Sequence, residues 1–300
     1  MKNLSRFLFF FLGCVLLAAI LTPWLYRFVQ WAKISWGWYW VDLAKYPFHR
    51  YFNRVLQLSI LIGIWPLLKQ SGFGSLEALG LKAPKPFRSF LKGFAWSLIF
   101  MSGYVALLFV MGWQNLKETP LASNLAFLIL KILSTACLVG FMEELFFRAY
   151  FYRLCQRELG KYWALGINLF IFSIFHYVKP PRGIDLGAVD WSSGFKLFLL
   201  GFQNSTQLHE CIGGLVVLAA IAFILCWAFG RTRHVYLITG LHAGWVFALL
   251  LNSELSHYSA GGANWILGGG DLSQGIVAFI PLTLQWITLK WWLSRRPEFS

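Results

Sequence analysis

The chain has 300 residues, of which 58% are hydrophobic and 13% charged, whereas a soluble domain has about 25% charged residues. This composition excludes a soluble globular protein and predicts that most of the chain lies in lipid. The net charge of +14 does not predict nucleic-acid binding, because the basic residues are spread over short loops between apolar segments.

Eight apolar segments approach the length of about 20 residues that a helix needs to cross a bilayer. They comprise residues 7–26, 55–68, 90–113, 121–159, 162–178, 211–229, 235–252 and 275–293. The fourth segment is too long for one crossing at about 1.5 Å per residue, so we expect it to break near its start or to project into water at its basic end. The sequence therefore predicts an all-α, polytopic transmembrane bundle of about eight spans.

Basic loops alternate along the chain with loops that are poor in basic residues. Residues 69–92, 153–161 and 231–233 form basic loops, whereas 114–120 and 253–271 are poor in Lys and Arg. By the positive-inside rule, this alternation predicts that both termini lie in the cytoplasm. Residues 27–54 disagree, because this basic loop would lie outside, and we expect it to form a Trp-rich interfacial helix.

A connection rich in Pro and Gly occupies residues 179–194. The apolar stretch 195–202 that follows is too short to cross a bilayer. We expect a lid or a re-entrant segment there.

Three charged residues stand inside an apolar segment, where each charge costs roughly 3 kcal/mol or more in lipid. They are Glu143, Glu144 and Arg148. Glu144 and Arg148 are four residues apart, so we expect them to pair on one face of a helix. Glu143 points about 100° away from that pair and needs a polar partner on another helix, a water-filled cavity or a proton.

Two histidines in other apolar segments are the expected companions of Glu143. Gly160 predicts a turn between two helices, and Glu144 and His176 each lie 16 residues from it, so an antiparallel hairpin would place them at the same depth. His242 lies inside the span that begins near residue 235. We therefore expect Glu143, His176 and His242 to line one polar chamber inside the membrane.

Other interpretations of these residues are open. A lone histidine in an apolar helix is more often a hydrogen-bonded packing residue. The Glu-Glu-x-x-x-Arg run alone fits an interhelical salt bridge or part of a proton relay. A proton-coupled transporter is the alternative from another class of protein, and the sequence has no internal repeat that favours it.

The polar residues resemble the motifs of the CAAX protease and bacteriocin-processing family of intramembrane proteases, which includes the Ras-converting CAAX endopeptidase. Three motifs of that family are similar to Glu143-Glu144-x-x-x-Arg148, Phe172-x-x-x-His176 and His242. The resemblance implies a catalytic core at residues 121–252, preceded by N-terminal helices and amphipathic loops at 1–120. A C-terminal loop and last helix follow at 253–300, within one structural domain.

The resemblance also implies hydrolysis of a peptide bond inside the membrane, near the end of the substrate. Glu143 would activate a water molecule, His176 would orient that water or protonate the leaving amine, and His242 would donate to the developing oxyanion. Glu144 and Arg148 would fix the helix so that Glu143 faces the chamber. These five residues are the candidate catalytic residues.

One position departs from the family pattern. The family usually has Asn or Asp four residues after the third-motif histidine, where this chain has Val246. This departure predicts a weakened oxyanion hole, or a catalytically inactive protein of the peptide-binding or immunity type. Asn168, Asn204 and Asn252 are not favoured as substitutes, and Asn252 is too far along the helix to share a turn with His242.

We expect no cofactor, with zinc as the alternative. Glu143, His176 and His242 would suit Zn²⁺ with an open position for water, although the chain has no His-Glu-x-x-His helix. A mechanism without metal explains the same three residues.

The expected partners are membrane lipids and a membrane-associated peptide or protein substrate, and not nucleic acid. The basic residues Lys179 and Arg182 are candidates for binding a substrate carboxylate, although such loop residues are more often solvated. We expect the protein in a bacterial plasma membrane.

Overall fold

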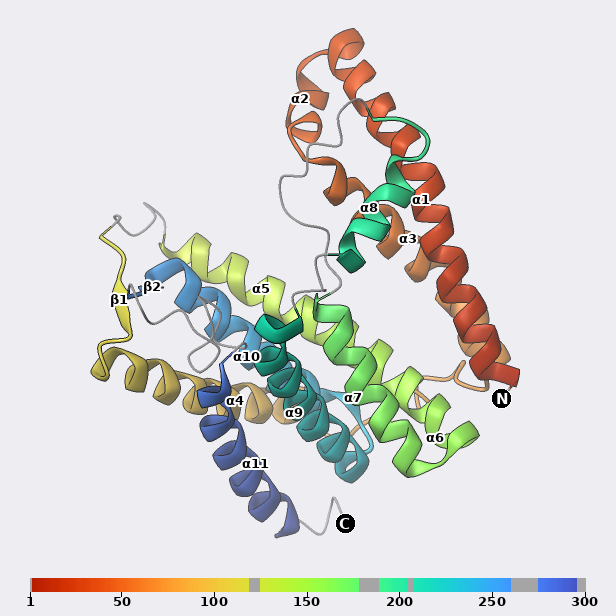
Figure 1. The fold of residues 1–300 in the computed structure, drawn as a ribbon. Coiled ribbons are helices and arrows are strands. Elements are labelled where there is room, and N and C mark those ends of the chain that lie inside the picture. Colours follow the sequence, from red (N-terminus) through yellow and green to blue (C-terminus); the bar gives the residue numbers. More distant parts are fainter. Residues whose placement is uncertain (1, 119–124, 178–188, 204–207, 260–274, 296–300) are drawn as a thin grey trace. The chain divides into compact units, whose positions relative to one another are not determined.

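The structure is a computed structural model that describes residues 2–118, 125–177, 189–203, 208–259 and 275–295. The described chain is mostly helical, and its strands form one two-stranded antiparallel ribbon, which confirms the predicted all-α class (Figure 1). The α-helices are α1 (Lys2–Trp36), α2 (Trp38–Ala44), α3 (Phe48–Gln70), α4 (Pro86–Val110), α5 (Leu125–Glu144), α6 (Arg153–Leu159), α7 (Lys161–Tyr177), α8 (Ser193–Gln203), α9 (Leu208–Thr232), α10 (Val235–Leu255) and α11 (Phe279–Ser294). The other elements are the π-helix η1 (Leu145–Tyr152), the 3₁₀-helix η3 (Ile276–Ala278), and the strands β1 (Gln114–Leu116) and β2 (Ser256–Tyr258).

Among the residues that the structure describes, six helical segments are long and apolar enough to cross a membrane, which supports a polytopic membrane protein. They are Lys2–Trp36, Phe48–Gln70, Pro86–Val110, Leu125–Leu159, Gly213–Thr232 and Val235–Leu255. The other two predicted spans correspond to α7 and α11, which have 17 and 16 residues and are shorter than the about 20 of a full crossing. Residues 125–159 form continuous helix, so the described part of the long fourth segment has no break.

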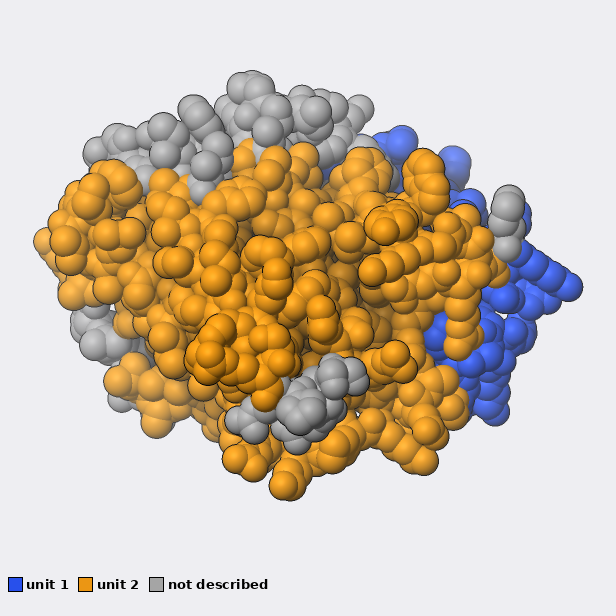
Figure 2. Space-filling model, turned by 90° about the horizontal axis from the view of Figure 1, so that it is seen from below, with its two compact units in different colours: residues 1–74, 175–208 blue, residues 75–174, 209–300 orange. Residues whose placement is uncertain are grey.

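The chain folds into two compact units (Figure 2). One unit comprises Met1–Gly74 and Phe175–Leu208, and the other comprises Ser75–Ile174 and His209–Ser300. The division of the sequence at residues 120 and 252 stays a prediction.

In the first unit, α1 and α3 lie side by side and run antiparallel, and α8 packs against α1 (Figure 1). Ala19 of α1 is buried in one apolar cluster with Phe52 of α3 and Leu197 of α8. The close approach of α8 requires a glycine, because a Cβ at Gly194 would collide with the backbone of Ala19.

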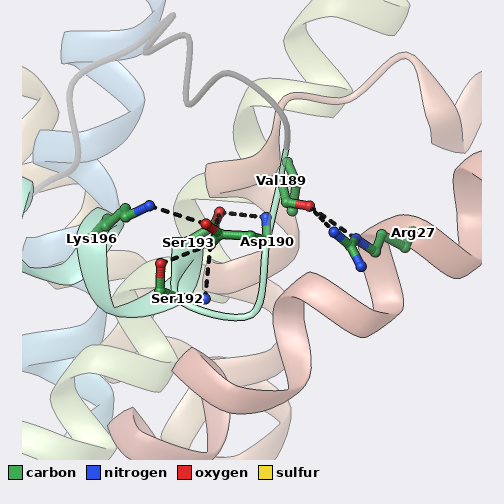
Figure 3. A network of polar contacts seen from close by, with 6 residues as sticks. All are labelled: Arg27, Val189, Asp190, Ser192, Ser193 and Lys196. Atoms are coloured by element: carbon green, nitrogen blue, oxygen red, sulfur yellow. Dashed lines mark hydrogen bonds and ion pairs between the residues drawn. The ribbon is translucent and has the colours of Figure 1, made fainter.

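Asp190 lies just before α8 and bonds to residues at the start of the helix (Figure 3). Its Oδ1 accepts hydrogen bonds from the Ser192 backbone and from the hydroxyls of Ser192 and Ser193, and its Oδ2 pairs with Lys196 at 3.2 Å. The hydrogen bonds from Ser192 and Lys196 hold the pKa of Asp190 well below its ordinary range. The carboxylate therefore stabilises the start of α8.

Arg27 links α1 to the segment that leads into α8. Its Nε donates to the carbonyl oxygen of Val189 at 2.9 Å (Figure 3). Of the predicted lid or re-entrant connection, residues 179–188 lie outside the described residues, and the role of the connection stays a prediction.

The region expected to form an interfacial helix contains a cluster of aromatic rings. Phe28 and Trp31 of α1 lie with Trp36 and Trp40 at ring separations of 5.2–5.9 Å. Trp31 and Trp36 are about half exposed, at 52% and 55%. Such rings suit the boundary between lipid and water. The interfacial position of residues 27–54 stays a prediction.

In the second unit, α10 packs mainly against α4 and α5. A Cβ at Gly240 would collide with the Phe90 carbonyl oxygen, and one at Gly244 would lie 2.7 Å from the Phe94 carbonyl oxygen. Two glycines four residues apart therefore let α10 approach α4 closely, as in membrane helix pairs with a small-x-x-x-small pattern. His242 lies between these two glycines in sequence.

Candidate active site

The two predicted glutamates lie where α5 changes into a π-helix. α5 ends at Glu144, and η1 continues the chain and carries Arg148. The sequence pattern predicted an α-helix throughout, and the observed π-helix is a rare form that is often found at functional sites. The predicted pair is nevertheless present, because Arg148 Nη1 donates to Glu144 Oε1 at 2.9 Å.

A close approach of α5 and α10 brings Glu144 to His242. Gly140 lies one turn before Glu144, and a Cβ there would be 3.1 Å from the Ala243 nitrogen and 3.2 Å from the Thr239 carbonyl oxygen. Only a residue without a side chain lets the two backbones come so near without adjustment. The neighbour of Ala243 in the chain is His242, so the contact at Gly140 positions both catalytic candidates.

Glu144 is fully buried and joins two cationic or donor groups. Its Oε1 accepts from Arg148 Nη1 and also from His242 Nδ1 at 2.7 Å. Arg148 is fully buried as well, and its guanidinium carbon lies 4.1 Å from the centre of the Phe172 ring. Pairing with a carboxylate and with an aromatic face makes a buried cation tolerable in lipid.

His242 lies between the two adjacent glutamates. Its Nε2 is 3.8 Å from Glu143 Oε2, while Nδ1 faces Glu144. The Glu143 side chain is 30% exposed, whereas those of Glu144 and His242 are 0% and 6% exposed. Of the two carboxylates, Glu143 is therefore the more exposed, while its Oε2, which faces His242, is itself buried.

His176 lies near the end of α7, one helical turn after Phe172. The predicted turn before this helix is present, because α7 begins directly after Gly160, which has a φ of +84°. His176 belongs to the first compact unit, and Glu143 and His242 belong to the second. Its convergence with them stays a prediction.

Two amides that the sequence analysis weighed as substitutes for the family residue at Val246 have other hydrogen-bond partners. Asn168 is fully buried, donates to the Phe147 carbonyl oxygen at 2.9 Å and accepts from Cys226 Sγ at 3.2 Å. Asn252 accepts from the Ser256 hydroxyl near the end of α10. Asn204, Lys179 and Arg182 lie outside the described residues.

A zinc site would need at least three His, Cys, Asp or Glu side chains close enough to bind one ion. In the described part of the chain, no group of three such residues is placed to hold a metal ion. Glu143 and His242 form a near pair, and a zinc ion would need further ligands. The zinc prediction with Glu143, His176 and His242 therefore remains for chelation to test.

The sequence analysis missed a second buried polar network beside α10. Gln285 of α11 is fully buried, accepts from Trp245 Nε1 at 2.9 Å and donates to the Ser97 hydroxyl of α4 at 2.9 Å. A glutamine inside the apolar segment 275–293 could have signalled it, by the same argument that singled out Glu143. The network holds α10 against α4 and α11.

A cleft of about 320 Å³ lies between α4 and the last turns of α10. Its lining is apolar apart from Ser102, Asn252 and Ser256, so it contains no general base. Ala248 is its lining residue closest to His242 in sequence, about 9 Å further along the helix. The cleft has room for an apolar chain, but its lining lacks the groups that peptide hydrolysis needs.

Comparison with known proteins finds one family. Residues 125–248 match the family described as type II CAAX prenyl endopeptidase Rce1-like. No curated protein and no solved structure matches the chain. The matched residues include Glu143, Glu144, Arg148, His176 and His242.

Proposed function

Because the chain belongs, through its Rce1-like residues 125–248, to the CAAX protease and bacteriocin-processing family, we propose that it is an intramembrane endopeptidase. It hydrolyses a peptide bond near the end of a membrane-associated protein or peptide. The observation that carries the proposal is the position of His242 between a fully buried glutamate, Glu144, and a partly exposed one, Glu143.

Glu144 orients the histidine in this proposal. Its carboxylate accepts from Nδ1 of His242, which fixes the ring and directs Nε2 toward Glu143 and the substrate. Arg148 balances the charge of Glu144 and holds that carboxylate in place. Neither Glu144 nor Arg148 touches the reacting atoms.

Glu143 is the proposed general base. In this proposal a water molecule enters beside the partly exposed Glu143 carboxylate and donates a hydrogen bond to it at about 2.8 Å. Glu143 takes a proton from this water, the hydroxide attacks the carbonyl carbon, and the C–N bond breaks as that proton passes to the leaving amine. His242 in its doubly protonated form donates from Nε2 to the developing oxyanion, and His176 orients the attacking water.

The proposed substrate is a protein or peptide that reaches the site from the membrane. The family name includes prenylated proteins among the candidates, as well as peptides without a prenyl group. Both termini of the chain are proposed to lie in the cytoplasm, with the chain in a bacterial plasma membrane.

The test is cleavage of a fluorogenic peptide library by the full chain in detergent, compared with Glu143→Gln and His176→Ala. Glu254→Gln is the matched control, because it makes the same change at an exposed position of α10. We expect both site variants to lose at least about a hundredfold in kcat/KM and the control to keep the wild-type value.

A chelator and added Zn²⁺ distinguish the two forms of the mechanism. Activity that persists in the chelator supports water activation by Glu143 alone, whereas activity that is lost and then restored by Zn²⁺ assigns Glu143, His176 and His242 as ligands. A wild-type protein that cleaves none of the peptides contradicts the proposal and favours the inactive peptide-binding or immunity-type protein suggested by Val246.

A further inference from the structure

A buried amide connects three helices behind the proposed active site. Asn168 of α7 has no solvent exposure, although α7 is otherwise apolar over most of its length. A buried amide without partners is costly in an apolar interior, so its contacts show what holds it there.

Each side of the amide contacts a different element. The Asn168 amide nitrogen donates to the carbonyl oxygen of Phe147 in η1 at 2.9 Å, and its oxygen accepts from Cys226 Sγ of α9 at 3.2 Å. Asn168 therefore ties the π-helix to α7 and α9.

The carbonyl that Asn168 holds belongs to the peptide group directly before Arg148. Fixing this peptide group limits the rotation of the residue that pairs with Glu144. Glu144 in turn accepts from His242 Nδ1. A continuous chain of short polar contacts thus runs from Asn168 through η1 and the ion pair to His242.

The π-helix makes this restraint necessary. In a π-helix each backbone hydrogen bond joins residues five apart in the chain, instead of four as in an α-helix, and such helices are rarely longer than a single turn. η1 extends over eight residues and carries Phe147 and Arg148 in its middle. A side-chain donor to one of its carbonyls stabilises the segment at the point where the orientation of Arg148 is set.

We infer that Asn168 is a positioning residue for hydrolysis, acting through Arg148 and Glu144 on the orientation of His242. This inference rests on the proposed function and deepens it. It explains why an amide on the second-motif helix is fully buried and bonded to η1 and α9.

The test compares Asn168→Leu with two controls in the full chain. Ser173→Ala removes a buried hydroxyl from the same helix, whose hydrogen bond goes to Leu169 of α7 itself. Gln285→Leu removes a buried amide that, like Asn168, contacts two other helices. The measurements are kcat and KM, thermal stability, and the His242 Nδ1–H resonance in protein labelled with ¹⁵N-histidine, assigned by its loss in His242→Asn.

We expect Asn168→Leu to lower kcat about tenfold to a hundredfold with little change in KM, because a displacement near 1 Å at a catalytic group has effects of this size. The His242 resonance should shift. Ser173→Ala should leave both kcat and the His242 resonance at their wild-type values. Gln285→Leu should lower thermal stability but shift the resonance less than Asn168→Leu does.

Asn168→Asp gives a second, milder variant in case the leucine variant does not fold. An aspartate side chain has the shape of asparagine and keeps an acceptor for Cys226, but it lacks the NH₂ group that donates to the Phe147 carbonyl. We expect kcat and the resonance to lie between those of wild type and Asn168→Leu.

The inference is overturned if Asn168→Leu, or Asn168→Asp where only that variant folds, leaves both kcat and the resonance at their wild-type values. The resonance also separates this inference from the proposed function. If the wild-type protein cleaves no peptide, the proposed function fails, and an unchanged resonance in the Asn168 variants still refutes the positioning role.

Discussion

A single methyl group at Gly93 should displace the helix that carries His242. Gly93 of α4 faces α10, where an added Cβ would collide with the carbonyl oxygen of Leu237 and lie 2.8 Å from the nitrogen of Leu241. Ordinary Cβ contacts begin at 3.4 Å. Opening the 2.8 Å contact to 3.4 Å moves α10 by about 0.6 Å, and the collision with the carbonyl requires more.

Gly93→Ala should therefore destabilise the protein by about 1–3 kcal/mol, as overpacking of a close interface does. The displaced segment leads directly into His242, so kcat should fall roughly tenfold to a hundredfold. Thermal unfolding in detergent measures the first effect, and peptide cleavage by the same preparations measures the second.

Gly103→Ala is the matched control, because Gly103 is on the same helix and an added Cβ there meets no atom within 4 Å. This variant should be as active as wild type and up to about 1 kcal/mol more stable, because alanine favours helix over glycine. If Gly93→Ala and Gly103→Ala have the same stability and the same kcat, then close packing at Gly93 does not position α10, and the argument is refuted.

Two further changes test a gain of activity and an acid transition. Val246→Asn restores the amide that the family usually has four residues after the third-motif histidine. We expect kcat to rise about tenfold or more, because one oxyanion donor is worth at least that in other enzymes. An unchanged kcat in the cleavage assay would show that Val246 does not limit the oxyanion hole. Because the pKa of Asp190 is lowered in the folded protein from an ordinary 3.8, its contacts stabilise α8 fully above that value and are lost as the pH falls through the folded-state pKa. Hydrogen exchange of α8 should accelerate in this acid range, and Asp190→Asn should remove the dependence on pH.

Local sequence spacing predicts the contacts that lie within one helix. Glu144 and Arg148 are four residues apart, and the structure contains their ion pair even though a π-helix begins between them. Gly160 similarly marks the observed turn before α7. These features depend on a few neighbouring residues, so the sequence carries the information directly.

Contacts between distant segments are harder to predict. The sequence analysis predicted His242 as a companion of Glu143, whereas its closer contact is with Glu144, at 2.7 Å. That contact depends on Gly140 letting α5 approach α10, and the identity of the facing helix is not encoded in either segment alone. Asn168 and Gln285 stand out in sequence as polar residues in apolar helices, but their partners depend equally on the packing of separate helices.

Two adjacent glutamates in one segment have different surroundings, and this difference decides their proposed roles. Glu144 has no exposure and is already engaged by Arg148 and His242, so taking a proton from water would disrupt the ion pair that neutralises Arg148. Glu143 is 30% exposed and lies within reach of the other histidine nitrogen. A general base must contact its water and an orienting group need not, so these surroundings support the proposed roles of Glu143 as the base and Glu144 as the positioning residue.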